Sequence, residues 1–280
     1  MKVFPRWSDI LGLGAEIVGY DIALNAPASA YERAVQVLQD DDTAQGALVT
    51  THKLDLYAAT HNLFDEFDDY AKLCAEVSCI SKRDGKLVGH AKDPITSGLA
   101  LEAFVPRNHW QETEGQVLCF GAGGAAVAIS LYLASLEKPP QKLTLVDTRG
   151  ERLEHCKSIH KKLQTTTQFE YQLNRDASEN DVLLEAQPPQ SLIINATGMG
   201  KDLPGSPLSD AAHFPDNALV WELNYRGELN FYHQAKAQEE EKALHVEDGW
   251  TYFLHGWTQV IAEVFQVEIT PELFEKLGTI

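Results

Sequence analysis

Basic residues are scarce in this sequence. Its 280 residues include 23 lysines and arginines against 41 aspartates and glutamates, which gives a formal net charge of −18 at pH 7. Such a surplus of negative charge repels nucleic acid phosphates and the headgroups of anionic lipids. The composition therefore argues against a nucleic-acid partner.

Long apolar runs are also missing. A membrane-spanning helix needs about 18 or more consecutive apolar residues, and the sequence has no such run. A signal peptide needs an unbroken apolar core, whereas Asp9, Glu16 and Asp21 interrupt the N-terminal stretch. We expect neither a membrane span nor a signal peptide, and we expect the protein to be cytoplasmic.

Metal-binding patterns are missing as well. The four cysteines have no paired CxxC spacing of the kind that binds zinc, and we interpret them as reduced thiols of the core. The ten histidines are scattered without a ligand triad, so we assign no metal. The cysteines are Cys74, Cys79, Cys119 and Cys156.

What the sequence does contain, from residue 116 onward, is a regular alternation of short apolar runs with helical patterns. This alternation is typical of a parallel sheet with crossover helices. The first half is less regular but also indicates an α/β fold, and we find no internal repeat or low-complexity linker. We expect strands at 116–121, 142–147, 169–173, 191–196 and 218–223, helices at 124–136, 150–163 and 177–186, and in the first half helices near 29–39 and 54–70 with strands at 46–50 and 75–81.

A glycine-rich loop lies between the first strand and the first helix of this alternating region. Gly121, Gly123 and Ala126 form G-x-G-x-x-A in the place that the dinucleotide-binding fingerprint requires. The first glycine allows a tight turn, the second lets a pyrophosphate approach the backbone, and the small third residue lets helix and strand pack closely. A glycine-rich turn without a ligand is the alternative interpretation.

Asp147 strengthens the dinucleotide interpretation. It ends the next strand, 21 residues after Ala126, close to the position from which an acid accepts hydrogen bonds from an adenosine ribose. A carboxylate there favours NAD because it repels the 2′-phosphate of NADP. Arg149 is a candidate partner for that phosphate, so NADP stays open.

Five segments together resemble the shikimate and quinate dehydrogenase family over nearly the whole chain. They are "GALVTTHK", "EVSCI", "GHAKDPITSGLAL", "GAGGAA" and "NATGMG". Family members have a substrate domain first, with a lysine in Asn-Val-Thr-x-Pro-x-Lys and an aspartate in Asn-Thr-Asp-Gly, followed by a Gly-Ala-Gly-Gly-Ala loop and an Asn-Ala-Thr segment. Lys53 matches the lysine and Asp93 the aspartate. The resemblance implies an NAD(P)-dependent dehydrogenase.

The departures from the family pattern fall on the groups that hold substrate. Residues 47–52 replace Asn-Val-Thr-x-Pro-x, the paired serines near the N-terminus are not visible, Ser78 stands for the strand asparagine, and Gly256 stands for a glutamine. A site built to bond particular hydroxyls discriminates through those groups. We therefore expect dehydrogenase chemistry on a substrate other than shikimate.

The resemblance gives Lys53 and Asp93 catalytic roles. Lys53 would donate a proton to a carbonyl oxygen in reduction and accept one from a hydroxyl in oxidation, while Asp93 would hold the ammonium in place. Simpler explanations exist for both residues. A lysine at the start of a helix is often a solvated charge, and Asp93 followed by Pro94 is also an ordinary helix start, with the aspartate as N-cap.

Other candidates follow from the same comparison. Asn195 and Thr197 come just after a predicted parallel strand, where ligands bind in open α/β sheets, and a strand-ending turn is the alternative. Tyr225 and His255 are candidate substrate contacts, each with core packing as the alternative. The full set for the cofactor is Gly121, Ala122, Gly123, Gly124, Ala125, Asp147, Arg149, Asn195, Thr197 and Met199, and the full set for the substrate is Ser78, Tyr225 and His255.

The sequence predicts a division of the chain into three regions and leaves three candidate functions. We expect an α/β substrate domain at 1–105, a Rossmann-type domain at 106–244, and a helical return at 245–280 that packs on the first domain. The main hypothesis is a monomeric or homodimeric NAD(P)-dependent dehydrogenase acting on a cyclic polyhydroxy acid or a related cyclic alcohol or ketone. The alternatives are a non-enzymatic NAD-binding regulator and a folate dehydrogenase. The folate dehydrogenase family is associated with a Tyr-x-x-x-Lys pattern, whereas Val49 stands four residues before Lys53 here, which argues against that alternative.

Overall fold

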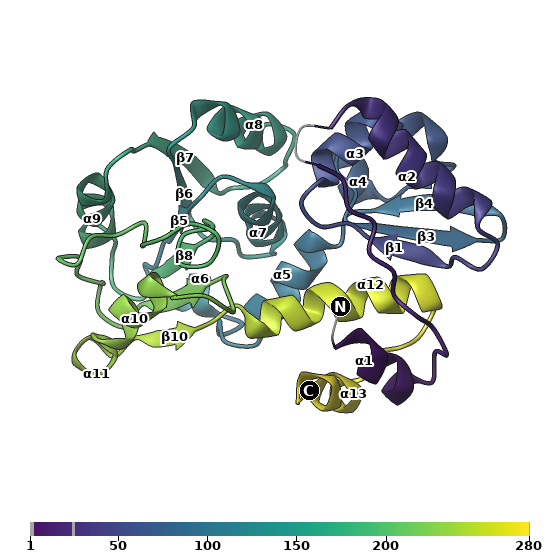
Figure 1. Cartoon of the computed structure of the whole chain (residues 1–280). Coiled ribbons are helices and arrows are strands. Elements are labelled where there is room, and N and C mark those ends of the chain that lie inside the picture. Colours follow the sequence, from purple (N-terminus) through teal and green to yellow (C-terminus); the bar gives the residue numbers. More distant parts are fainter. Residues whose placement is uncertain (1–2, 24–25, 280) are drawn as a thin grey trace. The chain divides into compact units, whose positions relative to one another are not determined.

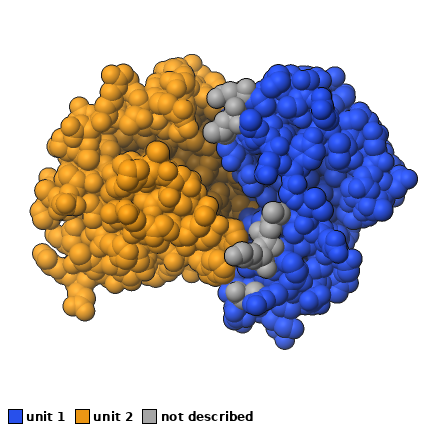
Figure 2. Space-filling model, viewed as in Figure 1, with its two compact units in different colours: residues 1–92, 254–280 blue, residues 93–253 orange. Residues whose placement is uncertain are grey.

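The computed structural model describes residues 3–23 and 26–279. The chain divides into two compact units, one formed by Met1–Lys92 with Leu254–Ile280 and the other by Asp93–Phe253 (Figure 2). These boundaries lie at 92 and 253, whereas we expected them near 105 and 244. The division into a substrate domain, a Rossmann-type domain and a helical return at the expected boundaries therefore stays a prediction.

The second unit is built on a six-stranded parallel sheet. Its strand order is β10-β9-β8-β5-β6-β7 (Figure 1), and all of its paired neighbours are parallel. The order reverses between β5 and β8, which makes their carboxyl ends the topological switch point of a Rossmann-type sheet. The strands are β5 Val117–Phe120, β6 Lys142–Asp147, β7 Gln168–Leu173, β8 Leu192–Asn195, β9 Leu219–Glu222 and β10 His245–Glu247.

Apolar side chains on the sheet hold the crossover helices of this unit. Phe120 of β5, Ile193 of β8 and Val220 of β9 belong to one buried cluster with Leu184 and Phe231 of two helices. The burial of β5, β8 and β9 along their whole length explains their continuous apolar sequences. The helices are α5 Asp93–Glu102, α6 His109–Glu112, α7 Gly124–Ser135, α8 Gly150–His160, α9 Ala177–Glu185, α10 Asn230–Lys236 and α11 Glu239–Lys242.

The first unit contains a smaller mixed sheet. Its order is β1-β3-β4-β2, with β3 antiparallel to both neighbours and β2 parallel to β4. Ile80 and Leu87 on one face of this sheet pack with Tyr31 and Val35 of α2 and Leu56 of α3. The elements are α1 Phe4–Leu11, α2 Ala28–Asp40, β1 Gly46–Leu48, α3 Lys53–Thr60, η1 His61–Leu63, β2 Glu66–Phe67, α4 Asp69–Cys74, β3 Cys79–Arg83, β4 Lys86–His90 and α13 Pro271–Gly278, together with the part of α12 Trp250–Phe265 that follows Phe253.

The α/β fold class with a Rossmann-type parallel sheet is confirmed, and so are the predicted strands and helices between residues 116 and 223. The helix expected at 54–70 is wrong in its second half: α3 ends at Thr60, and a 3-10 turn, β2 and the start of α4 follow. Residues 245–247 form an edge strand, so the C-terminal helix begins only at Trp250.

The four cysteines are buried, as expected for core thiols. Across residues 3–23 and 26–279, helices of the length and apolarity needed to cross a membrane are not found.

Candidate functional site

The glycine loop lies at the switch point of the parallel sheet. β5 ends at Phe120 and α7 begins at Gly124. Gly121 has a φ of +106°, and a Cβ added there would lie 2.7 Å from the carbonyl oxygen of Ala196. Glycine is therefore required at this position both by conformation and by space. At Gly123 a Cβ would meet no atom within 4 Å, so this second glycine leaves open space against the backbone.

The helix that follows the loop completes an anion-binding arrangement. α7 has 12 residues, and Gly124 and Ala125 form its first turn. The first N–H groups of a helix have no partner inside the helix and carry the positive end of its dipole. Ala126 is buried, as a small residue between helix and strand should be. This turn can bind the pyrophosphate of a dinucleotide.

Asp147 holds the glycine loop from the neighbouring strand. One carboxylate oxygen accepts a hydrogen bond from the N–H of Ala122 at 2.8 Å, and the other accepts from the N–H of Arg149 at 2.9 Å. The Arg152 guanidinium lies 3.6 Å from the carboxylate, and the Asp147 side chain is 6% exposed. Asp147 thus joins the loop to the turn after β6, and its contact with a ribose stays a prediction.

The segment after β8 packs directly against the glycine loop. The N–H of Ala196 donates to the carbonyl oxygen of Phe120 at 2.7 Å. The carboxamide oxygen of Asn195 accepts from the N–H of Thr197 at 3.1 Å and from its hydroxyl at 2.6 Å. The Thr197 hydroxyl oxygen in turn accepts from the N–H of Met199 at 3.2 Å. The three predicted residues therefore form one folded turn, and the Asn195 side chain shapes it from a fully buried position.

Sequence reasoning missed two residues of this site, Glu222 and Asn224. Glu222 is the last residue of β9 and lies opposite Asn195 in the parallel ladder. Its carboxylate accepts hydrogen bonds from the Asn195 amide at 2.7 Å, the Asn224 amide at 2.7 Å and the Asn224 main-chain N–H at 2.8 Å. Burial raises the pKa of Glu222 to about 7. The available signal was a single acidic residue at the carboxyl end of an otherwise apolar strand.

Tyr225 lies in an aromatic group just beyond β9. Its ring centroid is 4.3 Å from that of Phe253 and 6.1 Å from that of Trp250, and the Arg226 guanidinium lies 5.9 Å from its ring centre. The half-buried rings place Tyr225 at the carboxyl edge of the sheet, next to the Asn224 amide. A substrate contact by Tyr225 stays a prediction.

Lys53 and Ser78 are close in the first unit. Lys53 begins α3, and its carbonyl oxygen accepts from the N–H of Val77 at 3.1 Å. The Ser78 hydroxyl donates to the His90 carbonyl oxygen at 3.4 Å, and its oxygen accepts from the Lys92 N–H at 2.7 Å. Ser78 is 3% exposed, and its hydroxyl bonds to the backbone of the segment that precedes Asp93. α5 begins at Asp93, as expected, while the distance between the Lys53 and Asp93 side chains stays a prediction.

The C-terminal candidates lie on α12. The His255 ring stacks on Phe274 at 4.1 Å, its buried Nδ1 atom has no hydrogen-bond partner among residues 3–23 and 26–279, and burial lowers the pKa of His255 to about 4. His255 is therefore neutral at pH 7. At Gly256 a Cβ would meet no atom within 4 Å, so the position expected for glutamine in the resembled family has free space here.

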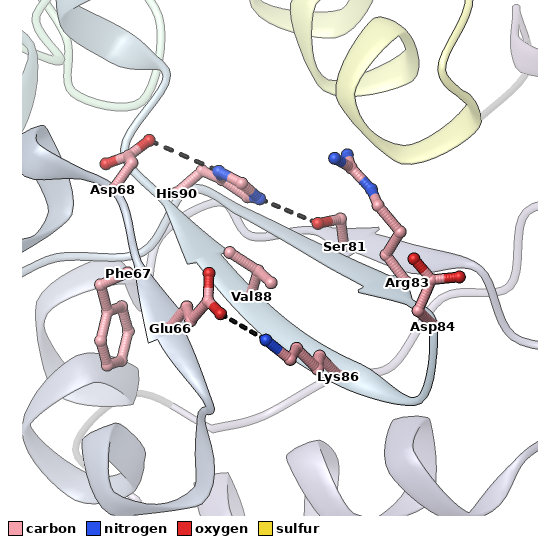
Figure 3. A pocket seen from close by; sticks show the side chains of 9 residues that line it. All are labelled: Glu66, Phe67, Asp68, Ser81, Arg83, Asp84, Lys86, Val88 and His90. Atoms are coloured by element: carbon pink, nitrogen blue, oxygen red, sulfur yellow. Dashed lines mark hydrogen bonds and ion pairs between the residues drawn. The ribbon is translucent and has the colours of Figure 1, made fainter.

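A cavity of about 400 Å³ lies on the β3–β4 sheet of the first unit (Figure 3). His90 bridges two residues in it: Nε2 is 2.8 Å from the Ser81 hydroxyl, and Nδ1 is 3.5 Å from the Asp68 carboxylate. Ser81 is 1% exposed and sits in the middle of β3 between β1 and β4. The Asp68–His90–Ser81 contacts have the residue types of a catalytic triad, but they connect the two strands β3 and β4 to the N-cap of α4. The lining is Glu66, Phe67, Asp68, Ser81, Arg83, Asp84, Lys86, Val88 and His90.

The chain is similar in sequence to shikimate dehydrogenases. The chain is 29% identical over 175 residues to "Shikimate dehydrogenase (NADP(+))" of Lactococcus lactis subsp. cremoris, a match that covers 62% of this chain and 59% of that protein. It is also 29% identical over 177 residues to the protein of that name from Methanocaldococcus jannaschii, covering 62% and 56%. The matched region thus spans less than two thirds of these relatives. No family model matches the chain.

Structure comparison covers nearly the whole chain. The shikimate 5-dehydrogenase of Listeria monocytogenes, solved in complex with shikimate and NAD, is 18% identical with a TM-score of 0.74 and covers 99% of this chain and 90% of that one. The 5-ketofructose reductase of Gluconobacter sp. strain CHM43 is 20% identical with a TM-score of 0.71, covering 99% and 91%. In sequence and in fold, the chain is shikimate dehydrogenase-like.

Proposed function

We propose that the protein is an NAD(P)-dependent oxidoreductase that transfers hydride between nicotinamide and a cyclic polyhydroxy acid or a related cyclic alcohol or ketone. The observation that carries the proposal is the glycine loop, where Gly121 fits closely against Ala196 and Asp147 holds Ala122. Both contacts lie at the switch point, where open α/β sheets bind their ligands. The sequence likeness to shikimate dehydrogenases supports the same chemistry.

The cofactor site fits a dinucleotide by its shape. A side chain at Gly121 would collide with the Ala196 carbonyl, and the space at Gly123 admits a pyrophosphate next to the backbone. When bound, the nicotinamide supplies the hydride acceptor or donor. Asp147 would orient the adenosine ribose from β6, and the Asn195–Met199 turn would border the cofactor from β8.

Lys53 and Asp93 would handle the proton. A lysine ammonium beside the substrate can protonate a carbonyl oxygen during reduction, and the neutral amine can accept the hydroxyl proton during oxidation. Asp93 would hold the ammonium through a charge-assisted hydrogen bond. The Ser78 hydroxyl supports this arrangement, because it fixes the backbone at Lys92, the residue before Asp93.

We propose NAD as the preferred cofactor. Asp147 places a buried carboxylate at the end of β6, where it would repel a 2′-phosphate. Arg149 and Arg152 are half-exposed; Arg149 follows the end of β6 by two residues, and the Arg152 guanidinium lies 3.6 Å from the Asp147 carboxylate. They are the cations through which NADP would bind if the preference is the reverse.

We propose that shikimate itself is a poor substrate. Ser78 stands for the family's strand asparagine, and its hydroxyl is used by the backbone of His90 and Lys92. Gly256 offers no side chain where a glutamine is expected. The same fold occurs in a protein named as a 5-ketofructose reductase, so the fold leaves the substrate open.

A binding measurement followed by a substrate screen tests the proposal. NADH and NADPH are titrated by fluorescence into the protein and into a Gly121→Val variant, which we expect to lose binding because its side chain meets Ala196. Cyclic hydroxy acids, amino-cyclitols and their ketones are then screened for a change in cofactor absorbance. Turnover of one of them supports the proposal, whereas cofactor binding without turnover of any class would favour a non-enzymatic regulator.

A further inference from the structure

We propose that Glu222 is a positioning residue that sets the geometry of the cofactor-facing Asn195–Met199 turn. The inference rests on the proposed function, since it concerns the same cofactor site. Glu222 is fully buried at the carboxyl end of β9, and its neighbour in the ladder is Asn195.

Glu222 fixes the orientation of the Asn195 carboxamide. Its Oε2 atom accepts from the Asn195 Nδ2 atom at 2.7 Å, which leaves the Asn195 oxygen pointing to Thr197. That oxygen accepts from both the N–H and the hydroxyl of Thr197. If the carboxamide turned over, it would lose the Thr197 bonds and place its oxygen against a carboxylate oxygen. The acceptor oxygen that Glu222 presents to Asn195 therefore fixes how the turn begins.

Glu222 also fixes the other end of the turn through Asn224. Its Oε1 atom accepts from the Asn224 main-chain N–H at 2.8 Å and from the Asn224 amide at 2.7 Å. The same Asn224 amide donates to the carbonyl oxygen of Met199 at 3.0 Å and to that of Thr197 at 3.3 Å. The carboxylate thus controls the turn from both sides without needing any contact with a ligand.

The turn has a direct connection to the glycine loop. Ala196, between Asn195 and Thr197, has its N–H bonded to Phe120 and its carbonyl oxygen against Gly121. A shift of the turn would move this carbonyl relative to the pyrophosphate-binding backbone. Displacements of well under 1 Å weaken binding when hydrogen bonds must be aligned.

Glu222 is the acceptor in each of these three hydrogen bonds. A neutral amide in its place, Glu222→Gln, would turn an NH₂ group toward the Asn195 NH₂ group. The single change Asn195→Asp would instead place two carboxylates together. The double change Asn195→Asp with Glu222→Gln restores complementarity, because the glutamine amide can donate to the new aspartate and its oxygen can still accept from Asn224.

The experiment measures the dissociation constants for NADH and NADPH of these three variants and the unaltered protein, at temperatures well below each melting temperature. We expect each single change to weaken cofactor binding about tenfold or more, and the double change to return it to within about threefold of the original. Asn180→Ala is the matched control. It removes a buried amide of the same unit that bonds to Asn174 and Pro207, and it should lower thermal stability without altering cofactor affinity.

A folded Glu222→Gln protein with unaltered affinity would overturn the proposal. So would a folded double variant that binds as weakly as the single ones. If Glu222→Gln does not fold, Glu222→Asp and the double variant carry the test. Failure of the unaltered protein to bind either cofactor would overturn the proposed function, and this inference with it, which separates that result from a failure of Glu222 alone.

Discussion

The main-chain N–H of Lys92 donates a hydrogen bond to the hydroxyl oxygen of Ser78, with 2.7 Å between the two heavy atoms. Ser78 also donates to the carbonyl oxygen of His90, so one side chain holds the end of β4 and the residue before Asp93. The neighbouring residue, Val77, bonds to the carbonyl oxygen of Lys53. The backbones of Lys53 and of Lys92, the residue before Asp93, are therefore both bonded to the two-residue segment of Val77 and Ser78.

Ser78→Ala should lower both stability and turnover. It leaves a buried N–H at Lys92 without its partner, which costs about 1–3 kcal/mol of unfolding free energy, and it loosens the backbone before Asp93. Ser81→Ala is the control, because Ser81 is equally buried on β3, which begins just after Ser78, and its hydroxyl lies 2.8 Å from the His90 ring rather than on the backbone before Asp93. Denaturant unfolding and steady-state kinetics check this: equal turnover in the two variants would contradict a positioning role for Ser78.

Lys53→Ala should lower the turnover number about a hundredfold or more, since proton transfer by a positioned group contributes about that much. The dissociation constant for the cofactor should stay nearly unchanged because Lys53 belongs to the unit without the glycine loop. Lys86→Ala, which removes an exposed lysine of the same unit, serves as control. Normal turnover of Lys53→Ala would remove the central catalytic assignment.

Asp147→Ser should weaken NAD binding about tenfold and narrow the difference between NAD and NADP. The change removes the carboxylate that accepts from Ala122 and Arg149 and that would repel a 2′-phosphate. Isothermal titration with both cofactors measures it, with Asp176→Ser at the exposed cap of α9 as control. Equal or tighter NADP binding by the unaltered protein would refute the NAD preference and point to Arg149.

The stability contributed by Glu222 should fall as pH rises through neutrality. Burial raises the pKa of Glu222 from 4.5 to about 7, so its protonated form is favoured in the folded state. The stabilising effect is complete below pH 4.5 and is lost as pH passes 7. Relative to Glu222→Gln, the unaltered protein should lose on the order of 2 kcal/mol of unfolding free energy between about pH 5.5 and pH 8.5. Urea unfolding at several pH values measures this difference, and a constant difference would show that Glu222 titrates normally.

Shikimate should be a poor substrate of the unaltered protein, and Gly256→Gln should improve its turnover. A Cβ added at this position meets no described atom within 4 Å, so a side chain can begin there without a collision. Each restored hydrogen bond to a bound hydroxyl is worth on the order of 1 kcal/mol, or roughly fivefold in turnover. Shikimate oxidation by the unaltered protein at the rate of its best substrate would show that the departures from the family pattern matter little.

The parallel sheet was predictable because its strands are short and continuously apolar and are separated by helical patterns. The helix expected at 54–70 was only half right. The spacing of Phe64 and Phe67 continues a helical pattern, but in the fold Phe67 packs between Phe64 and Tyr57 outside the helix. The three-residue strand β10 is too short to produce a pattern and forms because β9 offers it a parallel edge.

The candidate site was predictable where one segment carries the signal, as in the glycine loop and Asp147. Glu222 was missed because its partner Asn195 is 27 residues away, and only the register of β8 against β9 brings them together. The substrate contact expected of Ser78 stays a prediction, while the bonds of its hydroxyl to the backbone of His90 and Lys92 depend on the pairing of β3 with β4. Such pairings depend on strand register, which local sequence does not specify.

The first unit is discontinuous in sequence, and this has a consequence for its synthesis on the ribosome. The Trp7 indole N–H donates to the carbonyl oxygen of Leu277 at 3.0 Å, across 270 positions of the chain, and its ring lies 5.8 Å from that of Trp257. Nascent domains fold from the N-terminus as they emerge, yet Trp7 can bond to Leu277 only after all of the intervening residues have been made. The first unit can therefore be completed only after the second unit has been synthesised, and deletion of α13 would remove a hydrogen-bond partner of α1.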